Sequence, residues 1–179
     1  MAISRKEYAQ LSREEKLEVA YRWQYVQLVQ PTKVFVSPWI RAERYWYAPA
    51  YPKPTERCGK WMVYIPIDRV DAVWSIVRDA IVVGELGRAA KVATMAENSR
   101  TVYKDKRVLC VYTYDSDDLE DLKRVLVRMR ELGINQEAWY KEDRATRAGQ
   151  YSSNSNGPVT RDFAPENSIE FFPTKQGAK

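Results

Sequence analysis

The 179-residue chain contains no histidine. Histidine is the commonest general acid-base near neutral pH and the commonest ligand of transition metals, so catalysis here would need Lys, Glu, Asp, Tyr or Cys. The only two cysteines, Cys58 and Cys110, lie far apart in dissimilar contexts and show neither zinc-binding nor redox spacing. We therefore expect no metal, no cofactor and a reducing, cytoplasmic location.

Long apolar runs and common enzyme motifs are also missing. We find no stretch apolar enough to span a bilayer, no signal peptide and no internal repeat, so no membrane partner is expected. A P-loop, a G-x-S-x-G and an H-E-x-x-H pattern are absent, which sets the corresponding enzyme classes aside. The formal charge of +5 suits anionic ligands but is far from that of a dedicated DNA-binding protein.

The most strand-like stretch is the apolar run at residues 107–114. It lacks Gly and Pro and is rich in β-branched and aromatic residues, which predicts a central strand covered on both faces. Residues 60–67 alternate, so that Lys60, Met62 and Tyr64 share one face of a half-covered strand. Two shorter strands are predicted at residues 89–95 and 137–141.

Capping signals and apolar stripes predict three helices between and before these strands. The predicted helices run from the capping box Ser12–Glu15 to residue 29, from the cap Asp68 to Gly84, and from the capping box Asp117–Glu120 to Gly133. The resulting order predicts an α+β fold, with helices packed on one face of a mainly antiparallel, curved sheet.

Two segments lie outside this pattern. Residues 32–58 are rich in proline and aromatic residues, which predicts an ordered arm over one edge of the sheet. Residues 152–179 are expected to form a loosely structured tail, after a single domain that spans residues 1–151. Four apolar side chains could dock part of this tail: Phe163, Ile169, Phe171 and Phe172.

Several short motifs follow one another between residues 58 and 151. They are Gly59-Lys-Trp61, Val70-Asp-x-x-Trp74, Gly84-Glu-Leu-Gly87, Ala90-Lys-Val-Ala-Thr94, Leu109-Cys-Val-Tyr-Thr-Tyr114, and Tyr140-Lys-x-Asp143 with Thr146, Gly149 and Tyr151. In this order they resemble the basophilic leukaemia-expressed protein family, a largely uncharacterised group. The resemblance implies a fold like that of the cap-binding translation initiation factor 4E. Archaeal members of the family are often labelled phosphothreonine lyases.

The lyase label implies a site on two strands. In phosphothreonine lyases a Lys-aromatic-His strand supplies a lysine base and a histidine that protonates the leaving phosphate. By this resemblance Lys60 would be the base and Lys91 the second lysine, which holds the phosphate. Arg144 and Arg147, after the last strand, would complete the phosphate clamp.

The expected general acid is missing, because Met62 stands where the histidine belongs. A thioether cannot donate a proton. Either Tyr64, Tyr112 or Lys141 replaces the histidine in a metal-independent β-elimination of phosphate, or the chemistry is lost and a phosphate-binding pocket remains. A third interpretation is that Lys60 and Lys91 only face solvent.

Two other functions remain open. Trp39, Trp46 and Trp61 would stack a base in a cap-like nucleotide-binding or RNA-binding module. The second open function is that of a non-enzymatic protein, which would bind or inhibit a partner protein through the arm and the tail. Two other residues have structural interpretations. Tyr140 is expected to belong to the core, and Cys110 is expected to be an inert buried thiol.

Overall fold

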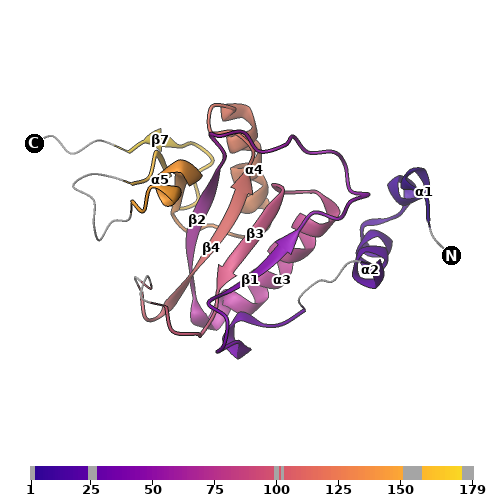
Figure 1. The fold of residues 1–179 in the computed structure, drawn as a ribbon, viewed down its shortest axis with the longest axis horizontal. Coiled ribbons are helices and arrows are strands. Elements are labelled where there is room, and N and C mark those ends of the chain that lie inside the picture. The colour runs from indigo at the N-terminus through magenta and orange to yellow at the C-terminus, as the bar shows by residue number, and fades with distance from the viewer. Residues whose placement is uncertain (1–2, 24–27, 99–100, 102, 151–158, 175–179) are drawn as a thin grey trace, which may run out of the picture.

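The computed structural model describes residues 3–23, 28–98, 101, 103–150 and 159–174. The helices are α1 (Arg5–Gln10), α2 (Arg13–Trp23), the 3₁₀ helix η1 (Pro31–Lys33), α3 (Ile67–Val83), α4 (Leu119–Glu131) and α5 (Asp143–Arg147). The strands are β1 (Trp39–Glu43), β2 (Gly59–Pro66), β3 (Ala89–Ala93), β4 (Lys106–Thr113), β5 (Ala138–Glu142), β6 (Asp162–Ala164) and β7 (Phe172–Pro173). Figure 1 shows their arrangement.

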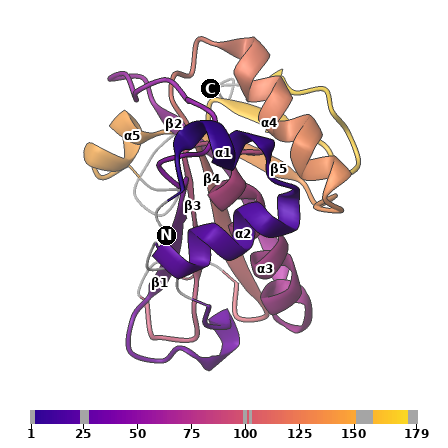
Figure 2. The same cartoon turned by 90° about the vertical axis from the view of Figure 1, so that its right-hand side faces the viewer.

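The described strands form one sheet in the order β1-β3-β4-β2-β5-β6-β7, and every neighbouring pair is antiparallel. Helices α3 and α4 lie on one side of this curved sheet, whereas the short α5 lies on the other (Figure 2). The predicted α+β fold class, with helices on one face of a mainly antiparallel sheet, is therefore confirmed. We call the face without α3 and α4 the open face.

The alternation in β2 separates the two faces. Trp61, Val63 and Ile65 are fully buried under the helices, and the Trp61 indole N–H donates to the carbonyl of Leu122 in α4 at 3.1 Å. Residues one step away on the same strand therefore point to the open face. The strand pattern of the sequence thus decides which side chains form the core and which are available to a ligand.

The apolar run at residues 107–114 forms β4, which lies between β3 and β2. Leu109 and Val111 are buried in the core, as predicted. The other face of the strand is not covered by a helix, because Cys110 and Tyr112 form part of the lining of cavities on the open face. The expectation of cover on both faces is therefore wrong for this half of the strand.

The predicted start of the N-terminal helix is confirmed. Ser12 and Glu15 form the expected capping box, with reciprocal hydrogen bonds of 3.2 and 2.8 Å. Helix α2 is described as far as Trp23. Residues 24–27 of the predicted continuation lie outside the described residues, but Leu28 and Val29 are not helical, so the predicted end at residue 29 is wrong. A second capping box, between Ser4 and Glu7, begins the unpredicted helix α1.

Two caps differ from the prediction. Helix α3 begins directly after Pro66, and Asp68 lies in its first turn, where a carboxylate still suits the helix dipole. In α4 the N-cap is Asp118 rather than Asp117, since the Asp118 side chain accepts a 2.9 Å hydrogen bond from the Asp121 backbone N–H. Gly84 ends α3 as predicted, with φ of 87°.

Three strands were missed. Part of the aromatic arm is β1, which pairs with β3 at the edge of the sheet. Strands β6 and β7 extend the opposite edge, and Phe171 packs its ring 5.4 Å from that of Trp61. This part of the expected loose tail is therefore integrated into the fold. Within the described ranges, no helix combines the length and the apolar character needed to cross a bilayer.

Candidate functional site

Strand register brings several of the predicted site residues together on the open face. Lys60 in β2 lies opposite Tyr112 in β4 on one side and Lys141 in β5 on the other. One row further along, Lys91 in β3 lies opposite Cys110 and Arg41. Residues from five strands, and from α5 at the rim, thus meet on one surface.

Two adjoining cavities open on this surface and share Lys60, Lys91 and Thr146. The first, of about 190 Å³, we call the aromatic cavity. Its lining includes Trp39, Lys60, Met62, Tyr64, Lys91, Tyr103, Cys110, Lys141 and Thr146. The second, of about 300 Å³, we call the basic cavity. Its charged lining is Arg41, Glu43, Lys60, Arg88, Lys91, Asp143 and Arg147.

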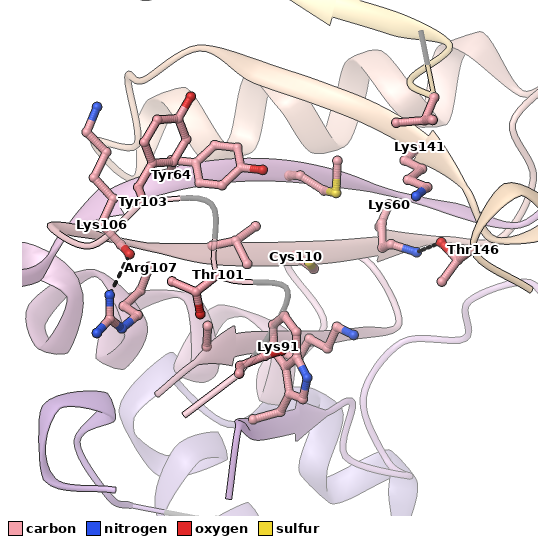
Figure 3. A pocket seen from close by; sticks show the side chains of 16 residues that line it. Lys60, Tyr64, Lys91, Thr101, Tyr103, Lys106, Arg107, Cys110, Lys141 and Thr146 are labelled. Carbon is pink, nitrogen blue, oxygen red and sulfur yellow. Dashed lines mark hydrogen bonds between the residues drawn. The ribbon is translucent and has the colours of Figure 1, made fainter. Parts of the chain in front are cut away.

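The aromatic cavity has two chemically distinct ends. Figure 3 shows Lys60, Lys141 and Thr146 at one end, with Tyr64 and Tyr103 at the other. The two tyrosine rings are 4.9 Å apart and close to perpendicular, in the edge-to-face arrangement that aromatic pairs favour. Lys106 and Arg107 also line the cavity at the tyrosine end, so its aromatic wall lies at a distance from Lys60 and Lys141 but not from every cation.

Lys60 is buried and already has partners. Its ammonium forms an ion pair with Asp143 and donates to the Thr146 hydroxyl at 3.1 Å. Both partners come from α5, which begins directly after β5. The structure thus places Lys60 in the expected cavity, but in an ion pair rather than as a free amine, and a base needs the free amine.

Lys91 is the second shared lysine, and its surroundings differ. Its Nζ lies 4.0 Å from the centroid of the Trp39 ring and 6.0 Å from that of Tyr112. Within the described part of the chain, it forms neither an ion pair nor a hydrogen bond. Burial lowers the pKa of the Lys91 amine. Lys60 and Arg41 act in the same direction, and Cys110 and Asp143 in the opposite one.

The candidates for the missing general acid also line these cavities. Lys141 is buried and donates to the Gln150 carbonyl at 2.6 Å, so it is tied to the segment after α5. Burial raises the pKa of both Tyr112 and Tyr64, which keeps their hydroxyl groups protonated at neutral pH. Met62 lines the aromatic cavity beside them.

The two arginines of the expected clamp are separated. Arg147 lines the basic cavity and also donates to the Glu56 carbonyl at 3.1 Å. Arg144 instead forms an ion pair with Glu142 and lines a different surface depression. The two guanidinium groups therefore point to different places, and only Arg147 reaches the site.

Of the three tryptophans expected to stack a base, only Trp39 lines the site. Trp61 lies on the opposite face of the sheet, where it is fully buried, so its assignment to stacking is wrong. Trp46 is 57% exposed and packs against Tyr45 and Tyr47, outside both cavities. Tyr140 and Cys110 are buried as predicted.

Sequence reasoning missed Arg41, Arg88 and Tyr103. A signal existed for Arg41, because alternation in residues 39–43 places it on the same face as Trp39 once this segment is recognised as a strand. Arg88 lies just before β3, with its guanidinium carbon 5.5 Å from the Tyr112 ring centroid. Tyr103 belongs to a loop, for which periodicity gives no signal.

The order of these elements agrees with a known family. The family model for basophilic leukemia-expressed protein Bles03 matches residues 54–148. The chain belongs to this family. The match includes β2, α3, β3, β4, α4, β5 and α5, and so most of the cavity lining, but not β1 with Trp39 and Arg41. No curated protein sequence matches the chain.

Solved structures of translation initiation factor eIF4E are similar to this chain in part. C. elegans eIF4E-3, solved with the 4E-binding protein Mextli and a cap analog, is 19% identical with a TM-score of 0.42, over 51% of this chain and 54% of that one. Schistosome eIF4E, complexed with m7GpppA and 4E-BP, is 13% identical with a TM-score of 0.46, over 60% and 59%. Ascaris suum eIF4E-3, with an m2,2,7G cap, is 16% identical with a TM-score of 0.41, over 60% and 57%.

The chain therefore spans less than two thirds of the length of these eIF4E structures. At TM-scores below 0.5, the similarity carries no conclusion about what this chain binds.

Proposed function

We propose that this protein is a binding module for nucleotides, with the phosphates in the basic cavity and the base in the aromatic cavity. The observation that carries this proposal is the junction of the two cavities at Lys60, Lys91 and Thr146. A ligand with an anionic end and a planar, apolar end would fill both cavities at once. A nucleotide has this character.

The charge of the basic cavity supports the phosphate end. Five basic side chains and two carboxylates line it, so its lining carries a net positive charge. Arginine suits phosphate because its planar fork can donate two parallel hydrogen bonds. The Arg88 Nε–H is buried and has no hydrogen-bond partner among the described residues. A phosphate oxygen would satisfy this donor, whose unpaired state is otherwise costly.

The aromatic cavity supports the base end. Trp39 lies on the edge strand β1 and forms one wall of this cavity, with Tyr64 and Tyr103 contributing other parts of its lining. A base that stacks on an aromatic side chain gains about 1 to 3 kcal/mol. The Lys91 ammonium beside Trp39 would then be placed between the base and the phosphates.

Binding is better supported than β-elimination of phosphate from phosphothreonine. The residue that matches the lyase base, Lys60, is held in an ion pair by Asp143. The position of the general acid is occupied by Met62, which has no proton to donate. A ligand-binding site requires neither a free amine nor an acid at these positions.

The proposal is tested by calorimetric titration of the full chain with ATP, GTP and 7-methyl-GTP, and with inorganic phosphate and a phosphothreonine peptide for comparison. We expect a nucleotide to bind more tightly than phosphate or the peptide, since only a nucleotide fills both cavities. Replacing Trp39 by Leu should weaken this binding by roughly 5- to 150-fold, the equivalent of about 1 to 3 kcal/mol.

Matched controls separate the site from the rest of the surface. Trp46→Leu removes an exposed tryptophan outside both cavities and should leave the affinity unchanged. Lys91→Met should weaken nucleotide and phosphate binding alike, whereas Lys53→Met, at an exposed lysine outside the cavities, should not. If no nucleotide binds, or if Trp39→Leu and Trp46→Leu behave alike, the proposal is wrong.

A further inference from the structure

The amine of Lys91 differs from those of its neighbours Lys60 and Lys141 in the site. Lys60 is paired with Asp143, and Lys141 donates to the carbonyl of Gln150. For Lys91, by contrast, the interactions within the described residues are with the faces of Trp39 and Tyr112 and with more distant charges. Its amine therefore has no hydrogen-bond acceptor among the described residues, and the carboxylate of Asp143 acts on it only from a distance.

The position of this amine is equally specific. Lys91 lines both cavities, so its amine lies where the basic cavity joins the aromatic one. A lysine becomes a nucleophile when it is desolvated or placed beside another cation, because both conditions favour the neutral amine. Lys91 meets both conditions, because burial and the positive charges of Lys60 and Arg41 lower the pKa of its amine, while Cys110 and Asp143 oppose this lowering only in part.

We propose that Lys91 forms a reversible Schiff base with small phosphorylated aldehydes or ketones. The phosphate of such a compound would bind in the basic cavity, near Arg41 and Arg88, and its carbonyl carbon would meet the amine at the junction. The remainder of the molecule would lie in the aromatic cavity beside Trp39. This reaction uses the cavities of the proposed function but does not require the ligand to be a nucleotide.

The reaction balances without any further reagent. The lone pair of the neutral Lys91 amine attacks the carbonyl carbon, and the C–O π bond becomes a hydroxyl after a proton moves from nitrogen to oxygen through solvent. The nitrogen lone pair then forms the C=N bond as the hydroxyl leaves, and the second proton of the amine, passed through solvent, completes the water that is released. Addition of water reverses these steps and returns the free lysine and the carbonyl compound.

Pyridoxal 5′-phosphate is a suitable probe, because it combines an aldehyde, a phosphate and an aromatic ring. The full chain is incubated with less than one equivalent of this compound near neutral pH, the Schiff base is reduced with borohydride, and the modified lysines are identified by peptide mass analysis. We expect the label to be concentrated on Lys91. Inorganic phosphate should compete, and pyridoxal, which lacks the phosphate, should label Lys91 less.

Two matched variants make the result decisive. Lys91→Arg keeps the positive charge but removes the nucleophile, so the dominant labelled peptide should be lost. Lys53→Arg, at an exposed lysine outside both cavities, should leave the labelling of Lys91 unchanged. Label spread over exposed lysines, label concentrated on Lys60, or equal labelling of Lys91 by pyridoxal and its phosphate would each overturn the proposal.

The labelling experiment tests the reactivity of Lys91 separately from the proposed nucleotide binding. The titrations report nucleotide affinity, whereas the labelling reports a covalent reaction at one amine. Binding without labelling would overturn only the reactivity of Lys91. Labelling without nucleotide binding would overturn only the proposal that the ligand of the two cavities is a nucleotide.

Discussion

At the scale of single residues, neighbours in the sequence have opposite roles. Lys60 and Trp61 are adjacent, but β2 directs the lysine to the open face and buries the tryptophan under α4. In the same way Lys91 lines both cavities, whereas Ala90 and Val92 on either side of it are buried in the core. The role of a side chain here depends more on the face of the sheet to which its strand position directs it than on its chemical type.

The carboxylate of Asp115, just after β4, illustrates how a single residue links pH to stability. Asp115 accepts hydrogen bonds from the Arg57 side chain at 2.8 and 3.0 Å, from Thr55 at 2.9 Å and from the Asp117 backbone N–H at 2.9 Å. The Arg57 guanidinium is the main cause that lowers the pKa of Asp115 from 3.8 to about 2. The charged form thus ties the loop before β2 to the end of β4.

Because this pKa is lower in the folded protein than in the unfolded chain, the stabilisation by Asp115 is complete above about pH 4 and is lost as the pH falls toward 2. We expect Asp115→Asn to be less stable than the wild type, by a difference that shrinks over this range. Urea unfolding measured as a function of pH tests this. Asp105→Asn, at an exposed aspartate, is the control. A pH-independent difference would contradict the expectation.

At the scale of elements, the approach of β3 to β4 depends on one glycine. A Cβ atom on Gly87 would lie 1.9 Å from the backbone oxygen of Tyr112, a distance that no side-chain adjustment can relieve. The Arg88 N–H donates to this same oxygen at 3.3 Å. Gly87 therefore sets how closely the strand that carries Lys91 approaches the strand that carries Tyr112.

Replacing Gly87 by Ala should force these two strands apart. Gly133→Ala is a matched control, because Gly133 has φ of 81° but nothing lies within 4 Å of its Cβ position. The control should cost about 1 to 2 kcal/mol of unfolding free energy, through left-handed backbone strain alone. Gly87→Ala should cost clearly more, and it should also weaken ligand binding. Equal losses for the two variants in urea unfolding would show that the backbone gives way easily at Gly87.

At the scale of the whole molecule, the sheet joins segments from both ends of the sequence. Strand β1 forms one edge, and β6 and β7 extend the other. The α1–α2 region packs on α3 through a second apolar cluster that includes Tyr8, Tyr45 and Val82. The site lies on strands β1 to β5 and on α5, and so includes the edge strand β1 but not β6 or β7.

The C-terminal strands should therefore contribute to global stability. A chain that ends at Thr174 keeps every described strand, whereas a chain that ends at residue 158 loses β6, β7 and the packing of Phe171 on Trp61. We expect the shorter chain to be less stable by at least about 2 kcal/mol, the value of burying one large apolar side chain. Equal urea midpoints for the two chains would refute this role for the C-terminal strands.

Local patterns predicted much of this structure. The strands β2, β3, β4 and β5 and the helices α3 and α4 were found from alternation, helical periodicity and caps, because each pattern repeats over a full element. Strand β1 was missed because its alternating residues are surrounded by prolines and aromatic residues. Strands β6 and β7 span only three and two residues, too few for any period to show.

For the candidate site, the sequence determined which residue types are available. The absence of histidine, the alternation that aligns Lys60 with Met62 and Tyr64, and the family motifs that include Lys91 can all be read from it. Only the tertiary structure decided how they are used. Pairing of strands distant in sequence placed Lys91 between Arg41 and Cys110, and α5 folded back to give Lys60 a carboxylate partner. These contacts depend on register between strands and on helix docking, for which a local sequence pattern carries no signal.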